Sequence, residues 1–180
     1  MTSRPIRLLA ISGSLRKAST NRALLGAAAL LAPAGMTIAI YDGVAALPHF
    51  NPDLDVDPLP APVIDLRAQV GAADGLLFSS PEYARGVPGS LKNALDWLVS
   101  SDVFPGKPVA FFHASERGVV SQAALRLILE TMSARILDEA SITISLLGTQ
   151  TDPRAIAEDI VMAEKIRAAL TALASALQAP

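Results

Sequence analysis

Hydroxyl groups and basic side chains crowd one short segment, residues 13–22, which reads Gly-Ser-Leu-Arg-Lys-Ala-Ser-Thr-Asn-Arg. Four of its uncharged side chains can donate hydrogen bonds: those of Ser14, Ser19, Thr20 and Asn21. Arg16 adds a permanently charged, forked donor that matches phosphate oxygens. The segment precedes a helical pattern, and the free N–H groups at a helix start favour anions. These residues predict a site for one phosphate group, and a capped helix with a solvated arginine is the alternative.

The common nucleotide-binding patterns are missing from this segment. Its single glycine, Gly13, does not complete G-x-G-x-x-G, and no G-x-x-x-x-G-K-[ST] pattern is present. Gly106-Lys107-Pro108 does not form such a motif either. Hydrolysis of a nucleoside triphosphate is therefore not favoured.

A second unusual loop, residues 81–90, follows the apolar run Gly75–Ser80 and contains prolines, glycines and Tyr83. The apolar run is typical of a strand buried on both faces. In open α/β sheets, ligands bind at loops that leave the carboxyl ends of central strands. We therefore expect both loops to line one site.

Strand and helix patterns alternate along the chain. The expected strands are Ile6–Ser12, Met36–Tyr41, Gly75–Ser80, Pro108–His113 and a fifth within Ile136–Leu147. The expected helices are 21–31, 63–73, 88–101, 120–132 and a last helical region from Pro153 to about Leu177. The alternation predicts an α/β fold, a doubly wound five-stranded parallel sheet with helices on both faces. The flavodoxin-like order 2-1-3-4-5 fits, with its switch point between the first and third strands.

The segment Asp42–Pro62 is long and irregular, with five prolines and four aspartates. Most connections run to about 4–6 residues, so a segment this long is expected to be functional or to form a pocket wall. Asp53, Asp55 and Asp57 are expected to form a solvated acidic loop.

The bulk composition excludes several classes of protein. The chain has 180 residues, 51% hydrophobic and 18% charged, which fits one globular domain spanning residues 1–180. A net charge of -2 without a basic stripe argues against nucleic-acid binding. The absence of cysteine excludes disulfides and thiolate metal sites. The most apolar stretch, Ala23–Ala34, is shorter than the roughly 20 residues of a membrane helix, so a cytoplasmic protein without membrane contact is expected.

Two motifs together resemble those of the NAD(P)H-dependent FMN reductases, a flavodoxin-like group that includes quinone, azo-dye and chromate reductases. The first loop is similar to the family pattern G-S-L-R-x-x-S-x-N. The second loop matches P-E-Y at residues 81–83 and P-G-x-L-K-N-A-x-D-W at residues 88–97. Both motifs stand in the right order, each after an expected strand, so the pair is more specific than either motif alone.

The resemblance implies a bound FMN, with its phosphate in the first loop and its ring edge along residues 81–83. It implies hydride transfer from NADPH or NADH through flavin N5 to a small-molecule acceptor such as a quinone, free flavin, an azo compound or a metal oxyanion. No side chain is expected to act as an acid or base. The implied flavin-binding residues are Ser14, Arg16, Ser19, Thr20, Asn21, Pro81, Glu82, Tyr83, Ala84, Arg85 and Ser115. Members commonly assemble as homodimers or homotetramers.

The chain also departs from the family pattern. The family often continues P-E-Y with N-x-S, where this chain has Ala84, Arg85 and Gly86. Arg85 and Arg117 are candidates for the 2'-phosphate of NADPH or an anionic substrate, or are solvated loop arginines. His49 and His113 are far apart in sequence and do not predict a metal site.

Two other functions remain open at this point. A flavodoxin-type electron carrier would hold FMN without oxidising NAD(P)H, although a net charge of -2 is low for the acidic face of such carriers. A non-catalytic flavodoxin-like binding module is the other alternative, in which residues 84–86 have lowered the affinity for flavin.

Overall fold

The structure is a computed structural model that describes residues 4–146, 148 and 150–178. Its strands form one parallel sheet in the order β2-β1-β3-β4-β5, with the short β6 also paired to β4. The strands are β1 Ile6–Ser12, β2 Met36–Tyr41, β3 Gly75–Ser79, β4 Pro108–His113, β5 Arg135–Ile136 and β6 Ile142–Thr143. The predicted order 2-1-3-4-5 is confirmed.

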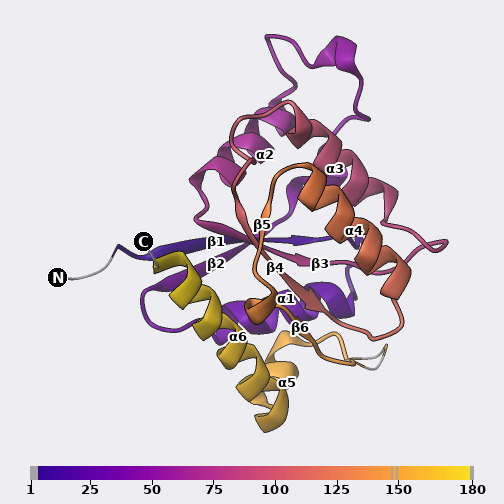
Figure 1. Cartoon of the computed structure of the whole chain (residues 1–180). Coiled ribbons are helices and arrows are strands. Elements are labelled where there is room, and N and C mark those ends of the chain that lie inside the picture. The colour runs from indigo at the N-terminus through magenta and orange to yellow at the C-terminus, as the bar shows by residue number, and fades with distance from the viewer. Residues whose placement is uncertain (1–3, 147, 149, 179–180) are drawn as a thin grey trace.

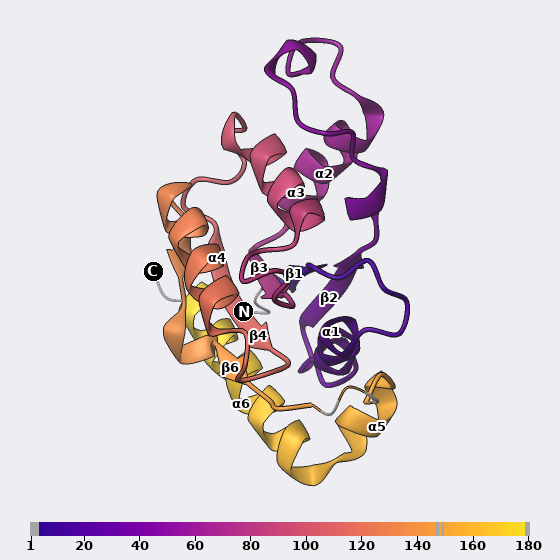
Figure 2. The same ribbon diagram turned by 90° about the vertical axis from the view of Figure 1, so that its right-hand side faces the viewer.

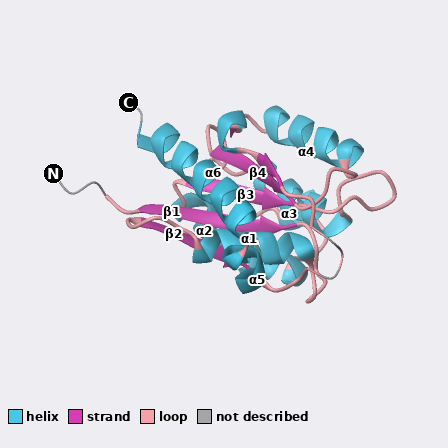
Figure 3. Ribbon diagram, turned by 90° about the horizontal axis from the view of Figure 1, so that it is seen from below, coloured by secondary structure: helices cyan, strands magenta, loops and turns pink. Residues whose placement is uncertain are grey.

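Helices cover both faces of the sheet (Figure 1). They are α1 Thr20–Leu30, α2 Ala61–Ala72, α3 Gly89–Val99, α4 Val119–Thr131, α5 Pro153–Glu158 and α6 Ile160–Gln178, with short 3-10 turns at Gly43–Ala46, Pro52–Leu54 and Asp138–Ala140. Helices α1, α5 and α6 lie over one face, which Figure 3 shows from below. Helices α2, α3 and α4 lie over the other.

Alternation along the strands divides the core in two. In β1, Leu8 and Ala10 pack in the cluster of α1, α5 and α6, whereas Leu9 and Ile11 pack in the cluster of α2, α3 and α4. Neighbouring strands alternate in the same way. Because both faces of β1, β3 and β4 are buried, these strands read as nearly continuous apolar runs in the sequence.

The fifth strand differs from the prediction, because it is broken into β5 and β6. Residues Pro108 and Val109 of β4 pair with β5, and the end of β4 pairs with β6. Between them, the Ser141 hydroxyl accepts a hydrogen bond from the Phe111 N–H at 3.0 Å and donates to the Leu137 carbonyl at 2.9 Å. This side chain replaces the backbone partner that a continuous strand would supply. Leu147, where the predicted range ended, lies outside the described residues.

The last helical region is also interrupted, which the sequence prediction missed. Asp159 has extended backbone angles, φ -69° and ψ 118°, between α5 and α6. Its carboxylate accepts a hydrogen bond from the Met162 N–H at 2.9 Å. Asp159 therefore begins α6 as a capping residue, as aspartate commonly does.

The long segment before α2, residues 42–60, is fastened to α3 and is called the strap below. The Pro48 carbonyl accepts hydrogen bonds from Trp97 Nε1 at 2.8 Å and from Asn93 Nδ2 at 2.9 Å. Asn93 Oδ1 also accepts from the Phe50 N–H at 2.7 Å. Two residues of the family motif in α3 thus hold the strap.

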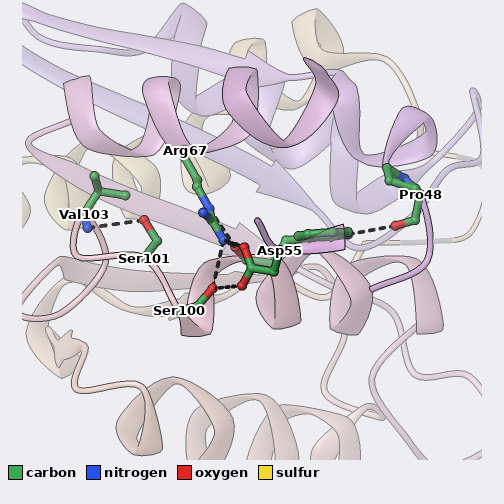
Figure 4. A network of polar contacts seen from close by, with 7 residues as sticks. Pro48, Asp55, Arg67, Ser100, Ser101 and Val103 are labelled. Atoms are coloured by element: carbon green, nitrogen blue, oxygen red, sulfur yellow. Dashed lines mark hydrogen bonds and ion pairs between the residues drawn. The ribbon is translucent and has the colours of Figure 1, made fainter. Parts of the chain in front are cut away.

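The acidic part of the strap is not simply solvated, contrary to the expectation for Asp55. Its carboxylate pairs with Arg67 Nη2 at 2.8 Å and accepts a hydrogen bond from Ser100 (Figure 4). Arg67 also donates to the Trp97 carbonyl at 2.8 Å. The Ser100 hydroxyl and Arg67 lower the pKa of Asp55. Asp53 and Asp57 remain exposed, as expected.

Candidate functional site

The loops that follow β1, β3 and β4 lie together at the carboxyl ends of these strands, on the side seen in Figure 2. The Gly13 N–H donates to the Ser79 carbonyl at 2.9 Å, which joins the first loop to the end of β3. A Cβ atom at Gly13 would lie 2.4 Å from the Ser80 Oγ, so only glycine permits this approach. The Ser79 hydroxyl also donates to Asn21 Oδ1 at 3.0 Å.

The first loop is ordered by its own hydroxyl groups. The Ser14 Oγ accepts from the Arg16 N–H at 3.3 Å, and Ser19 caps α1 by accepting from the Arg22 N–H at 3.4 Å. Ser14 and Ser19 are buried, as is Asn21. Within the described part of the chain, the Arg16 guanidinium has no ion pair. Its charge is available to a ligand.

A cleft of about 350 Å³ lies where the three loops meet, and is called the three-loop cleft below. Five of the predicted site residues line it: Thr20, Asn21, Pro81, Glu82 and Ser115. Ser80, Arg117 and Gln122 line it as well. The predicted convergence of the first and second loops on one site is therefore found in the structure, together with the third.

Ser14 and Arg16 line a neighbouring cleft of about 400 Å³, between the first loop and the end of β2. Lys17 and Arg22 add positive charge there, and Arg22 pairs with Asp42 at 2.5 Å. The first loop thus contributes to two clefts: Ser14 and Arg16 line one, Thr20 and Asn21 line the other, and Ser19 caps α1 and lines neither.

The other predicted residues of the second loop form an exposed turn. Tyr83 and Gly86 exchange backbone hydrogen bonds of 3.1 and 3.0 Å, and Ala84 and Arg85 have φ values of 48° and 62°. Left-handed angles at both central positions are those of a type I' turn, which prefers asparagine and glycine. The family's asparagine suits this geometry, whereas alanine and arginine adopt it at a cost of about 1–2 kcal/mol each.

Glu82 and Ser121 join the second loop to the start of α4. Glu82 Oε2 accepts hydrogen bonds from the N–H groups of Val120 and Ser121 at 3.1 and 3.0 Å. The Ser121 hydroxyl donates to the Pro81 carbonyl at 3.3 Å. Ser121 and Gln122 belong to the site surroundings although the sequence did not single them out. Their place in the first turn after the third loop was the available signal.

His113 ends β4 immediately before the third loop. Its ring stacks on Phe111, with centroids 5.5 Å apart and an angle of 9° between the planes. Burial and the nearby Arg126 lower the pKa of His113 to about 4. The imidazole is therefore neutral at neutral pH and packs as an aromatic ring.

The site fits FMN in its chemistry and its size. Small-molecule sites commonly measure about 300–1,000 Å³, and the three-loop cleft falls within that range. Thr20 and Asn21, at the start of α1, offer hydrogen-bonding side chains to the cleft, and residues 80–82, where the second loop begins, line it as well. Among the described residues, no helix is long and apolar enough to cross a membrane.

A parallel sheet of order 2-1-3-4-5 with a cleft at its switch point defines a flavodoxin-like protein. Residues 6–146 match the family model described as NADPH-dependent FMN reductase. The chain belongs to this family.

Relatives and solved structures agree with that assignment. The chain is 44% identical over 112 residues to an NAD(P)H-dependent FMN reductase of Pseudomonas aeruginosa, which covers 61% of this chain and 60% of the relative. It is 32% identical over 159 residues to a quinone reductase of Escherichia coli, with 84% of each chain covered. The structure of FerB, a flavoenzyme NAD(P)H:(acceptor) oxidoreductase from Paracoccus denitrificans, matches with a TM-score of 0.78 and 26% identity. The match covers 96% of this chain and 97% of the FerB chain. The recognised family, the flavodoxin-like fold and the oxidoreductase class are confirmed.

Proposed function

We propose that the protein binds FMN in the three-loop cleft and acts as an NAD(P)H-dependent oxidoreductase toward a small-molecule acceptor. The observation that carries the proposal is the convergence of Thr20, Asn21, Pro81, Glu82 and Ser115, from three separate loops, on one cleft. FMN, when bound, supplies hydride transfer between a nicotinamide and the acceptor.

The chain's own residues bind and orient the cofactor in this proposal. Hydroxyl groups and N–H groups at the start of α1 hold the phosphate, and Arg16 reaches it from the neighbouring cleft. The backbone of residues 81–83 lies along the ring edge. Tyr83, which is 53% exposed, is free to flank the flavin ring in this proposal.

We assign the acceptor to the quinone class, because a relative that is aligned over 84% of this chain is named a quinone reductase. Donor and acceptor would use the same open face in turn. Steady-state rates measured with NADPH and a benzoquinone should therefore give parallel double-reciprocal lines. Intersecting lines would contradict one shared face. Tight FMN binding without any oxidation of NADPH or NADH would instead identify an electron carrier.

Arg16→Ala tests the phosphate assignment. A charge-assisted contact to phosphate contributes about 1.5–3 kcal/mol, so its loss should weaken FMN binding by roughly 10- to 100-fold. Fluorescence titration measures the dissociation constant. Arg154→Ala, which removes an exposed arginine from α5, is the control and should leave the affinity unchanged. Equal affinities of the Arg16 variant and the wild type would refute this assignment.

We further propose that the chain assembles as a homodimer or homotetramer in the cytoplasm. Exposed apolar side chains support assembly: Val99 of α3, and Val119 and Leu127 of α4, are 62–65% exposed. Leu127→Glu should shift the mass measured by light scattering toward the monomer. Leu30→Glu, at an exposed leucine of α1, is the control and should not. A monomeric wild type would refute the proposal.

A further inference from the structure

Glu82 lines the three-loop cleft, yet its carboxylate is bonded to a neighbouring helix. Glu82 Oε2 accepts from the N–H groups of Val120 at 3.1 Å and Ser121 at 3.0 Å, both in the first turn of α4. A carboxylate that accepts two backbone N–H groups makes charge-assisted hydrogen bonds. The Glu82 carboxylate is therefore held by hydrogen bonds to the first turn of α4.

Helix α4 has no cap of its own. Its N-cap residue, Gly118, offers no side chain, and its first turn contains no acidic residue. A helix start leaves N–H groups without partners and carries a partial positive charge of about half a unit. Glu82, from the loop after β3, supplies both the missing acceptor and the missing negative charge.

A second contact joins the same two loops. Ser121, which is 2% exposed, donates its hydroxyl proton to the Pro81 carbonyl at 3.3 Å. A Cβ atom at Gly118 would lie 3.7 Å from the Glu82 Cβ, so the loops touch at this point. The walls formed by residues 80–82 and 114–118 are therefore held together at adjacent positions.

We infer that Glu82 is a positioning residue that holds these two walls of the three-loop cleft together. Its carboxylate also offsets the partial positive charge at the start of α4, which faces the cleft. This inference rests on the proposed function, which assigns the cleft to FMN. It extends that function by giving Glu82 a role in cofactor affinity and redox potential without proton transfer. Without the carboxylate, the positive helix start would favour the reduced cofactor, which carries more negative charge.

The first test uses the protein without cofactor. Amide hydrogen exchange is measured for Val120 and Ser121, which bond to Glu82, and for Tyr83 and Gly86 in the second loop. Glu82→Ala should accelerate exchange at all four amides, by about tenfold or more. Faster exchange at Val120 and Ser121 alone would reduce Glu82 to a helix cap and overturn the coupling of the two walls.

The second test uses the FMN-loaded protein. Glu82→Gln keeps an oxygen that accepts the N–H groups but removes the charge, so FMN affinity should stay within about threefold while the midpoint potential rises. Glu82→Ala should weaken FMN binding about tenfold and also raise the potential. Asp152→Ala is the matched control, because Asp152 caps α5 by accepting from the Arg154 N–H at 2.9 Å. Asp152→Ala should lower the melting temperature but change neither the FMN affinity nor the midpoint potential.

Wild-type affinity in Glu82→Ala, together with a wild-type potential in Glu82→Gln, would overturn the inference. Failure of the wild type to bind FMN would instead refute the proposed function. The exchange experiment separates these results, because it needs no cofactor.

Discussion

Several polar residues that the sequence assigns to cofactor binding also hold the protein's own loops together. Asn21 accepts a hydrogen bond from Ser79, and Glu82 accepts two from α4. The residues of the first loop predicted a site at Asn21, and the family resemblance implied one at Glu82, because both motifs follow expected strands. Their partners were not predictable, because they come from segments distant in sequence that only the fold brings near. Binding of FMN by these residues stays a prediction.

His113 gives a pH dependence at the scale of a single residue. Its pKa is lowered to about 4 in the folded protein, by burial and then by Arg126, from 6.5. Between these values only the unfolded chain takes up the proton, so stability falls as the pH falls from about 6.5 toward 4. Above pH 6.5 the imidazole is neutral in the folded and the unfolded state, so it does not make the stability depend on pH.

His113→Phe should remove this part of the pH dependence while keeping the ring stacked on Phe111. Between pH 7 and pH 5 the free energy of unfolding should fall by about 1 kcal/mol less in the variant than in the wild type, after allowance for the partial exposure of His113. Urea unfolding at the two pH values measures the difference. His49→Gln, which removes the other histidine, is the control. Equal losses in the free energy of unfolding for the wild type and His113→Phe would contradict the expectation.

Among the elements, the strands buried on both faces were predicted well, because an apolar run bounded by polar loops leaves few alternatives. The bounds of β1, β2 and β4 match the expected ranges. The fifth strand was not predicted as it is, because its break depends on the Ser141 hydroxyl bonding to Phe111 of another strand. Local alternation in the sequence carries no information about that bond.

The strap, too, was predicted only in part, because its contacts join segments that are distant in sequence. Its length predicted a functional segment or a pocket wall, and its start lines the cleft beside Arg16 through Asp42, Val44 and Ala45. Its anchors on Asn93 and Trp97 were not foreseen, although the motif containing them was recognised.

Arg67→Met tests the strap at the scale of elements. The substitution leaves the mostly buried Asp55 carboxylate without its ion-pair partner and removes the bonds to the Trp97 carbonyl. We expect a loss of about 2 kcal/mol in the free energy of unfolding, together with faster proteolysis within residues 50–60.

Chemical denaturation and limited proteolysis measure the two effects. Lys92→Met, which breaks the exposed pair with Asp96, is the control and should cost about 0.5 kcal/mol or less. If Arg67→Met costs no more than this control and leaves proteolysis unchanged, the network in Figure 4 does not hold the strap.

For the whole molecule, alternating strand and helix patterns limited the topology to a few choices, and the flavodoxin-like order expected for five strands is the order observed. Topology then placed the candidate ligand site, because the loops after β1 and β3 meet at the switch point. The division of the first loop's residues between two clefts was not predictable, because it depends on the path of the loop backbone.

The central claim, that FMN bound in this cleft is reduced by a nicotinamide, is tested most directly by visible absorption. The spectrum of the protein with added FMN is recorded before and after anaerobic addition of NADPH, and again with NADH. We expect bound flavin whose absorption bleaches with at least one donor. Absence of flavin binding, or bound flavin that stays oxidised with both donors, would contradict the claim.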